Sequence, residues 1–409
     1  MIRVNTNIIK FNMKKFIYIL AASFILTGTL MAQTSFDELA KTPPMGWNSW
    51  NTFRLNINEE LVKEVADVFV EKGLKDAGYQ YLVIDDGWQI GRDDKGNILS
   101  NEEKFPSGIK SLVDHIHSVE LKFGIYSDAG YMTCGGFPGS LGYEYQDART
   151  YADWGVDYLK YDWCHTGNKS APDSYKLMKN ALLMAGRPIV FSICEWGASQ
   201  PWTWAPEVGN LWRTTFDIRP CWDCGERVES MGRMVENFIG FTKILDLQEG
   251  LESYSGPGAW NDPDMLEVGN GQLTYDENVA HFSLWCILAA PLMLGNDIRT
   301  MSDEVLEIIK NKEVIAVNQD PLGRQGKKVR DDGNFEVWSR ELHDGSRAVV
   351  LFNRSEKERE IGFDWSEVGL PQNLKFTVRD LWEKKDKGHY NGSYSDLVPA
   401  HGVIMVRVF

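Results

Sequence analysis

The segment YLKYDWC, residues 158–164, decides how this chain folds. Residues 158–161 are apolar or aromatic apart from one lysine, which predicts a short buried strand. Lys160 and Asp162 stand at its end, two residues apart, so their side chains lie on the same face. Burying a charged pair costs free energy unless the pair has partners or a function. Taken alone, the segment is equally compatible with a structural salt bridge and with a functional site.

Seven other short apolar runs end in the same way, with polar or aromatic residues at the carboxyl side. Between them lie helical patterns: Asn58 can cap a helix with an apolar stripe over 62–70, and a second stripe covers 109–116. Eight strand–helix units in roughly 280 residues predict an α/β fold, a (β/α)8 TIM barrel, in which functional residues lie at the carboxyl ends of the strands. The eight runs are 45–48, 81–86, 123–128, 158–162, 189–195, 211–217, 260–264 and 291–297.

The pattern changes at about residue 325. Alternating segments such as 335–338 and 348–352 follow one another, separated by turn signals such as Asp344-Gly345 and Asn391-Gly392. Several short alternating strands of this kind predict a C-terminal antiparallel β-sandwich domain. We therefore expect the barrel at 41–320 and the sandwich at 325–409.

Composition limits the partners of the chain. Its 409 residues carry a net charge of −15, which disfavours a nucleic-acid backbone as a partner, and 43% of them are hydrophobic, which supports a large core. The chain has 15 Trp and 15 Tyr. Flat aromatic faces can bind the apolar side of a sugar ring, although most such side chains belong to cores.

Residues 1–32 resemble an export signal. Lys14 and Lys15 precede an apolar run at 16–26, and small residues allow cleavage after Ala32. Met13 is a better start for such a signal than Met1. The run is short for a membrane span, no Cys near Ala32 indicates a lipid anchor, and no later segment reads as a span. We expect an exported protein, periplasmic or secreted.

The cysteines and histidines do not predict a metal site. Cys221 and Cys224 have the spacing of half a zinc site, but no second pair or nearby His completes it. His115 and His117 are two residues apart on a predicted helix, where they do not share a face. We therefore expect no metal and no cofactor, and whether Cys221 and Cys224 are paired stays open.

Carboxylates, Lys, Arg and Trp at the strand ends suit glycoside cleavage, which uses two carboxyl groups. Asp162 ends the fourth predicted strand, and Asp217 follows the sixth, 217 − 162 = 55 residues later. The ends of these strands face the same central well, so the two carboxylates can meet there.

Nine motifs in order resemble one family over nearly the whole chain from Lys41 to Phe409, the alpha-galactosidases of glycoside hydrolase family 27. The motifs are PMGWNSW at 44–50, Asp85-Asp86, GIYSDAG at 124–130, PGSLGYE at 138–144, YLKYD at 158–162, CEWG at 194–197, WRTT at 212–215, Asp217-Ile218 and WNDPDML at 260–266.

The resemblance implies an exo-acting alpha-galactosidase that hydrolyses terminal alpha-D-galactosyl residues of oligo- or polysaccharides with retention. Asp162 matches the nucleophile and Asp217 the general acid/base. Asp85 and Asp86 suit the 4- and 6-hydroxyls, Lys160 the 3- and 4-hydroxyls, and Glu195 the 2-hydroxyl, where it would exclude an acetamide. The implied substrate-binding set is Trp47, Asp85, Asp86, Tyr126, Cys134, Lys160, Glu195, Trp196, Arg213 and Asp264.

We further predict a Cys134–Cys164 disulfide at the pocket wall, with two buried thiols as the alternative. Leu55 and Gly87 stand where many family members carry a bridged cysteine pair, and Trp163 replaces a common Asn. Three alternatives stay open: an alpha-N-acetylgalactosaminidase, a beta-L-arabinopyranosidase, and a non-catalytic galactoside-binding protein. The oligomeric state is not predicted.

Overall fold

The computed structural model describes residues 38–230 and 233–409, and the predicted export signal at 1–32 lies outside them. Residues from Leu39 to Phe409 form one compact unit. Within the described ranges, no helix has both the length and the apolar character needed to cross a membrane.

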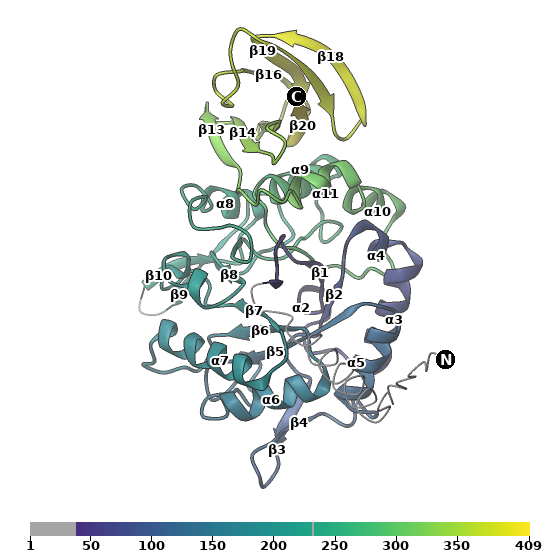
Figure 1. Ribbon diagram of the computed structural model, residues 1–409, viewed down its shortest axis with the longest axis vertical. Helices are drawn as coiled ribbons and strands as arrows, with labels where there is room; N and C mark the ends of the chain where they lie inside the picture. Colours follow the sequence, from purple (N-terminus) through teal and green to yellow (C-terminus); the bar gives the residue numbers. More distant parts are fainter. Residues whose placement is uncertain (1–37, 231–232) are drawn as a thin grey trace, which may run out of the picture. The chain divides into compact units, whose positions relative to one another are not determined.

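Eight parallel strands form the sheet at the centre of the barrel (Figure 1). They follow one another in chain order, and the last strand pairs with the first. A single parallel bridge between Leu266 and Leu294 joins the segment after the seventh strand to the eighth. The prediction of a TIM barrel is confirmed. Its strands are β1 (Met45–Asn48), β2 (Tyr81–Val83), β5 (Lys122–Asp128), β6 (Tyr158–Asp162), β7 (Val190–Ile193), β8 (Leu211–Arg213), β11 (Trp260–Asp262) and β12 (Leu292–Leu294).

Helices cover the outside of the sheet because their apolar stripes need a partner. In α3, the Asn58 side chain accepts a hydrogen bond from the Leu61 N–H, and the predicted stripe residues Val62, Val65, Ala66 and Phe69 are buried. The helices are α2 (Trp50–Phe53), α3 (Glu59–Glu71), α4 (Leu74–Ala77), α5 (Ile109–Ser118), α6 (Glu144–Trp154), α7 (Ala171–Ala185), α8 (Phe241–Asp246), α9 (Tyr275–Ile287), α10 (Asp303–Ile309) and α11 (Lys312–Asn318).

The strand–helix alternation departs from the regular pattern at three places. Between β7 and β8, two 3-10 turns, η2 (Pro201–Thr203) and η3 (Ala205–Glu207), replace the expected helix. Pro206 follows Pro201 by five residues (206 − 201 = 5), so a helix that began at Pro201 would be interrupted in its interior. Two hairpins extend from the carboxyl side of the sheet: β3 (Gln89–Arg92) with β4 (Ile98–Ser100), and β9 (Glu226–Ser230) with β10 (Arg233–Asn237).

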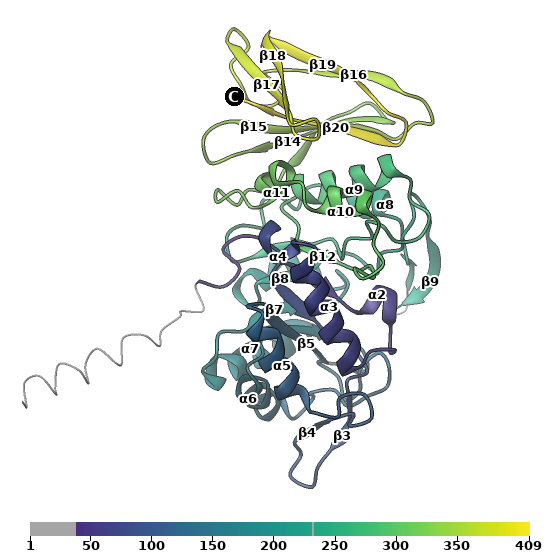
Figure 2. The ribbon, with the colours of Figure 1, turned by 90° about the vertical axis from the view of Figure 1, so that its right-hand side faces the viewer.

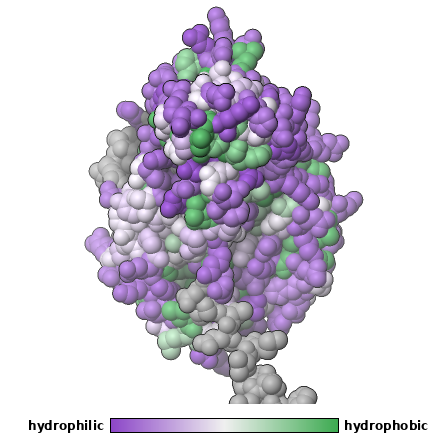
Figure 3. All heavy atoms as spheres, turned by 45° about the horizontal axis from the view of Figure 1, so that its top comes forward, coloured by the Kyte–Doolittle hydropathy of each residue, from purple (hydrophilic) through white to green (hydrophobic). Residues whose placement is uncertain are grey.

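Two antiparallel sheets make the C-terminal sandwich, as predicted (Figure 2). A separate apolar core, including Val349, Phe363 and Trp365, fills the space between them. Hydrophilic residues cover most of the face shown in Figure 3, with hydrophobic ones in small groups. The sheets are β13-β14-β15-β20-β17-β18 and β16-β19, from β13 (Lys327–Asp331), β14 (Phe335–Glu341), β15 (Arg347–Asn353), β16 (Arg359–Asp364), β17 (Lys375–Asp380), β18 (Lys385–Asn391), β19 (Ser393–Val398) and β20 (Gly402–Val408).

Helix α9 joins the barrel to the sandwich. Every residue from Glu277 to Ile287 is buried, because one side packs on the barrel and the other on β14, β15 and β20. The buried Arg340 guanidinium donates to the Cys286 carbonyl (3.0 Å), and the Trp382 indole donates to Ser283 Oγ (2.9 Å). These polar contacts fix one orientation of the sandwich against the barrel.

Leu55 lies directly against Gly87, where many family members have a disulfide. A Cβ placed on Gly87 would stand 2.8 Å from Leu55 Cδ2, and the Gly87 φ of +92° also favours glycine. The leucine side chain therefore occupies the space that a second side chain would need.

Candidate active site

One pocket opens at the carboxyl ends of the barrel strands, where the sequence predicted the functional side chains. Ten of the twelve predicted site residues line it. They come from six strand ends and their loops, so residues up to 179 positions apart (264 − 85) face the same space. The ten are Asp85, Asp86, Tyr126, Cys134, Lys160, Asp162, Trp196, Arg213, Asp217 and Asp264.

Asp162, the last residue of β6, is held at the pocket floor. Its Oδ2 accepts a hydrogen bond from the Tyr126 hydroxyl (2.9 Å), and its Oδ1 accepts one from the Trp163 N–H (2.9 Å). Burial raises the pKa of Asp162, the Lys160 charge opposes that rise, and the carboxylate of Asp217 adds to it. Together these effects bring the pKa to about 6. Asp162 is therefore an oriented carboxylate that becomes an anion near neutral pH.

Lys160 lies in β6 and forms an ion pair with Asp85, which follows β2. Its ammonium donates to Asp85 Oδ2 (2.8 Å), and the Asn48 amide donates to the same oxygen (2.9 Å). Burial lowers the lysine pKa, but Asp85 and the other acidic groups outweigh it and leave the pKa well above its usual value. The lysine is therefore a permanent cation two residues from Asp162.

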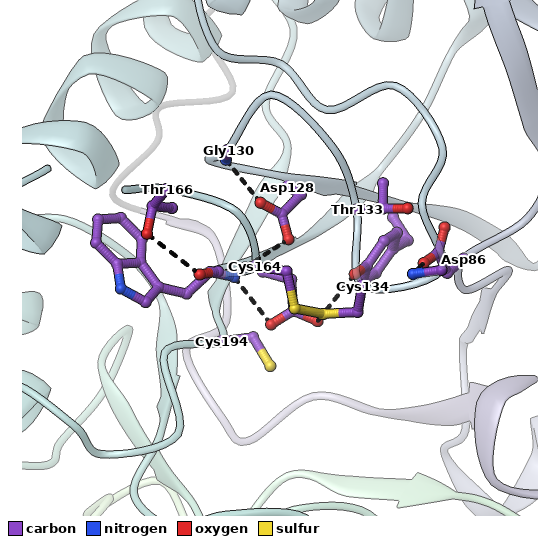
Figure 4. Close-up of a disulfide and its surroundings, with 12 residues drawn as sticks. Asp86, Asp128, Gly130, Thr133, Cys134, Cys164, Thr166 and Cys194 are labelled. Carbon is purple, nitrogen blue, oxygen red and sulfur yellow. Dashed lines mark hydrogen bonds between the residues drawn. A yellow bond between two sulfur atoms is a disulfide. The ribbon is translucent and has the colours of Figure 1, made fainter. Parts of the chain in front are cut away.

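The predicted Cys134–Cys164 disulfide is present and forms one wall of the pocket (Figure 4). Asp86 Oδ2 accepts from the Gly135 N–H (2.7 Å) beside Cys134, and Asp128 Oδ2 accepts from the Cys164 N–H (2.9 Å). The sulfur of Cys134 lies 3.4 Å from Asp162 Oδ2. Two buried carboxylates thus fix the bridge at both ends, and the bridge contacts the predicted nucleophile.

Arg213, at the end of β8, lies between two carboxylates on the opposite wall. Its guanidinium contacts Asp264 Oδ2 at 2.9 Å and Asp217 Oδ1 at 3.2 Å. Burial raises the pKa of Asp264 while the Arg213 charge opposes that rise. Arg213 is buried, whereas the Asp217 side chain is 38% exposed, so Asp217 is the carboxylate of this wall that solvent can reach.

Asp217 belongs to a loop whose backbone is hydrogen-bonded to residues at and just after the end of the β9–β10 hairpin. The Asp217 N–H donates to Asn237 Oδ1 (3.2 Å), and its carbonyl accepts from the Ile239 N–H (3.1 Å). The next residue, Ile218, donates its N–H to Asp264 Oδ2 (2.9 Å). The position of Asp217 therefore depends on a segment about 20 residues further along the chain.

Two predicted site residues do not line the pocket, Trp47 in β1 and Glu195 in the turn after β7, and strand alternation explains the first. Asn48 points into the barrel, so its neighbour Trp47 points to the helices, where it packs on Phe53 and donates to the Asn296 carbonyl. Cys194 and Trp196 face the pocket, and Glu195 between them is fully buried and accepts from the Ser199 N–H (2.7 Å). Trp47 and Glu195 are thus absent from the pocket lining, and their contacts with the sugar stay predictions.

Seven further residues line the pocket that the sequence did not assign to it. Trp50 and Cys194 belong to motifs that carried the resemblance. Both follow a barrel strand closely, Trp50 at the start of α2 and Cys194 after β7, so their place at a strand end was the signal that could have found them. Phe238 follows a hairpin with no recognisable motif, and nothing in the sequence places it beside Asp217. The seven are Trp50, Asn51, Arg54, Cys194, Ile218, Phe238 and Met265.

Four potential metal ligands lie close together at the pocket wall, with ligand atoms within 4.8 Å of one another: Asp128, Cys134, Asp162 and Cys164. Both sulfurs belong to the disulfide and offer no thiolate, which leaves two carboxylates already hydrogen-bonded to the protein. This group is a poor metal site.

The Cys221–Cys224 pair, which the sequence left open, is bonded. It lies in the loop after β8, between Asp217 and the β9–β10 hairpin. Cys194 and Cys286 are free and buried.

Comparison with known proteins gives matches over both domains. The family model for "Alpha galactosidase A" matches residues 42–320, and that for the "Alpha galactosidase C-terminal beta sandwich domain" matches 332–408. Alpha-galactosidase A of Cellvibrio japonicus is 47% identical over 94% of this chain and 96% of its own. The crystal structure of alpha-galactosidase I from Mortierella vinacea has a TM-score of 0.87 and 38% identity, covering 92% of this chain and 98% of that one.

A third match is a structure with a bound sugar. The alpha-galactosidase of Saccharomyces cerevisiae with raffinose has a TM-score of 0.87 and 31% identity, and covers 92% of this chain and 99% of that one.

Proposed function

Since this chain belongs to the alpha galactosidase A family and is a glycoside hydrolase, we propose that it removes terminal alpha-D-galactosyl residues from oligo- or polysaccharides with retention of configuration. One observation carries the proposal: the pocket holds two carboxylates in opposite environments. Asp162 is buried and oriented by two hydrogen bonds, whereas Asp217 is solvent-accessible and sits on the facing wall. Glycoside cleavage with retention needs this division into nucleophile and acid/base.

In the first step, Asp162 attacks the anomeric carbon from the side opposite the leaving group. Asp217 gives its proton to the glycosidic oxygen as the bond to the leaving sugar breaks, which leaves a beta-linked galactosyl ester on Asp162. Hydrogen bonds from Tyr126 and Trp163 stabilise the attacking carboxylate. In the second step, Asp217 takes a proton from water, which attacks the same carbon; the ester bond to Asp162 breaks, its carboxylate is regenerated, and the alpha configuration is restored.

The Lys160 ammonium and the carboxylates of Asp85 and Asp86 form the part of the pocket that suits the galactose hydroxyls. Lys160 Nζ and Asp85 Oδ2 are already paired at 2.8 Å, so they present a donor and an acceptor side by side. A polar pair of this kind discriminates strongly against a sugar that lacks the matching hydroxyl, because a buried polar group is then left without a partner. Asp86 suits a 6-hydroxyl, which arabinopyranose lacks.

We further propose that Cys194 and Trp196 limit the space at the 2-position, the part first assigned to Glu195. Both line the pocket beside Arg213. A bulky indole at this place disfavours the acetamide of N-acetylgalactosamine, because the side chain would have to move to admit it.

Hydrolysis of three nitrophenyl glycosides tests the proposal: the alpha-galactoside, the alpha-N-acetylgalactosaminide and the beta-L-arabinopyranoside. We expect the highest kcat/KM for the alpha-galactoside, and NMR of the first product should show alpha-galactose. Highest turnover of either other glycoside would assign the pocket to that sugar. No turnover of any of them would favour a binding protein, and beta-galactose as first product would exclude Asp162 as nucleophile.

Two further proposals concern the chain as a whole. Domain boundaries at 41–320 and 325–409 are supported by the end of α11 at Asn318 and the start of β13 at Lys327. Export after cleavage of residues 1–32 is supported by the two disulfides, which form in oxidising compartments. Mass spectrometry of the mature N-terminus tests the cleavage site.

A further inference from the structure

Aromatic side chains lie in the part of the pocket that contains Asp217. Trp196, which lines the pocket, is stacked on Phe216, with ring centroids 6.2 Å apart and 15° between the planes. Phe238 lines the pocket together with Ile218. Phe216 and Phe238 are half-buried, so part of each ring is accessible.

Phe238 has an unusual backbone. Its φ is +53°, a left-handed conformation that bulky residues rarely adopt. Such a conformation persists only where the surroundings hold it, and it is a reason to look for a function. The Arg219 guanidinium lies over the Phe238 ring, 4.5 Å from the centroid, and the ring also lines the pocket.

Hydrogen bonds, a disulfide and a stacked ring pair hold together the segments that carry Arg219 and Phe238. The Arg219 N–H donates to the Ile239 carbonyl (2.9 Å), and the Gly240 N–H donates to the carbonyl of Cys224, inside the Cys221–Cys224 bridge (2.9 Å). Trp222, between the two cysteines, stacks on His401 of the sandwich with centroids 4.3 Å apart and 9° between the planes. These contacts hold Phe238 in place beside Asp217.

The chemistry fixes where the leaving sugar must lie. Asp217 protonates the glycosidic oxygen, so the sugar attached to that oxygen has to be next to Asp217. The strand ends around Asp85, Lys160 and Asp162 surround the galactose, which leaves the side of Phe216, Ile218 and Phe238 for the leaving group. An aromatic face next to a guanidinium can pack on the C–H face of a sugar and donate to its hydroxyls.

We propose that Phe238 and Arg219 form the binding site for the leaving-group sugar, so that this protein prefers galactosides whose leaving group is itself a sugar. The inference rests on the proposed function, because it takes Asp217 to be the acid. It assigns a role to Arg219 and Phe238, for which the sequence provided none.

Raffinose and methyl alpha-galactoside separate this role from others. Both lose an alkoxide that needs the proton of Asp217, but only raffinose has a leaving sugar. The quantity to measure is the ratio of kcat/KM for raffinose to kcat/KM for methyl alpha-galactoside. We expect Phe238→Ala to lower this ratio about tenfold, since an aromatic contact of this type is worth roughly that factor.

Two other substitutions at position 238 identify the ring as the cause. Phe238→Tyr keeps the aromatic face and should keep the ratio within about twofold of the wild type. Phe238→Leu keeps apolar bulk without the ring and should lower the ratio as Phe238→Ala does. The control is Tyr275→Ala, an aromatic residue that is 55% exposed and outside the pocket, and it should leave the ratio unchanged.

The outcomes distinguish the proposals. An equal loss on both substrates in Phe238→Ala would mean that Phe238 only supports Asp217, and an unchanged ratio would mean that it does not contact the leaving sugar. Either result overturns the inference while the proposed function stands. If the wild-type protein fails to hydrolyse nitrophenyl alpha-galactoside, the proposed function itself fails.

Discussion

The two sides of the pocket are built in different ways. The strand wall (Asp85, Tyr126, Lys160 and Asp162) consists of side chains at strand ends, and the carboxylates of Asp85 and Asp162 are nearly inaccessible and hydrogen-bonded. The loop wall (Trp196, Asp217, Ile218 and Phe238) consists of residues beyond the strands, and Asp217 is held there by hydrogen bonds to Asn237 and Ile239. The barrel sheet itself therefore fixes one half of the site, whereas loops supply the other half.

The largest effect is expected in the strand wall, from Asp162→Ala. Loss of a nucleophile should reduce kcat by on the order of 10⁴-fold or more, because no other group on that wall can take over covalent catalysis. Azide should partly restore turnover and give beta-galactosyl azide, since it attacks from the face that the carboxylate has left. Substantial turnover without azide would show that Asp162 is not the nucleophile.

Asp217→Ala tests the loop wall and should have a smaller and more selective effect. General acid/base catalysis contributes about 10²–10⁴-fold, so hydrolysis of methyl alpha-galactoside should fall by that factor. Formation of the galactosyl enzyme from a nitrophenyl galactoside should fall much less, because nitrophenolate leaves without a proton. Burst kinetics measure this step, and an equal loss with both leaving groups would argue against Asp217 as the acid.

The two disulfides allow the walls to be compared directly. Cys134–Cys164 spans 30 residues and Cys221–Cys224 spans 3, so loop-closure entropy predicts losses of roughly 3.5 and 2 kcal/mol when each pair is replaced by serine. Chemical denaturation measures both. The Cys134/Cys164 variant should also lose activity on raffinose and methyl alpha-galactoside alike, because Cys134 contacts Asp162.

The Cys221/Cys224 variant should instead lose activity on raffinose selectively, because that bridge braces the loop of Phe238. Selective loss in the first variant, or equal loss in the second, would contradict the division into a strand wall and a loop wall.

The pH dependence of stability tests the strand wall alone, without any change in substrate. Folding raises the pKa of Asp162 from 3.8 to about 6, so the folded state binds more protons than the unfolded state between these values. The stability contributed by this group is therefore fully present below pH 3.8 and is lost as the pH rises through about 6. Asp162→Asn removes that loss.

We compare the free energy of unfolding of Asp162→Asn with that of the wild type. As the pH rises from 4 to 7.5, we expect this difference to grow by up to about 3 kcal/mol in favour of the variant, because the pKa of Asp162 changes by about two units on folding. Denaturation at both pH values measures this difference. Asp114→Asn, at an exposed position of α5, controls for the loss of a carboxylate at the surface. A constant difference between Asn variant and wild type across this range would mean that folding leaves the Asp162 pKa unchanged. For the same reason, kcat/KM should fall as the pH drops below about 6.

Much of the strand wall could be predicted from the sequence because it follows from local rules. Alternation along a strand places Lys160 and Asp162 on one face, and the parallel barrel brings all strand ends to one rim. The same rule, applied at 45–48, places Trp47 on the face opposite Asn48. It does not reach 194–196, which lie beyond the end of β7 at Ile193, so the burial of Glu195 between two pocket residues depends on the turn that follows the strand.

The loop wall could be predicted only in part. Asp217 was found through a motif, but its neighbour Phe238 was not, since 21 residues and the β9–β10 hairpin separate them (238 − 217 = 21). The pairing of Cys221 with Cys224 could not be decided either, because a spacing that permits a bond does not require one. No local pattern encodes which loops meet above a barrel.

The eight-stranded barrel and the sandwich could be predicted from the sequence because periodicity within short segments indicates them, and the two carboxylates and the wall disulfide could be predicted because their motifs resemble those of a family. Which side chains line the pocket, and how the loop after β8 packs beside it, follows only from contacts in the folded chain. Those contacts join segments distant in sequence, such as Trp222 with His401 and Asp217 with Asn237, and their geometry is set by packing between domains and loops.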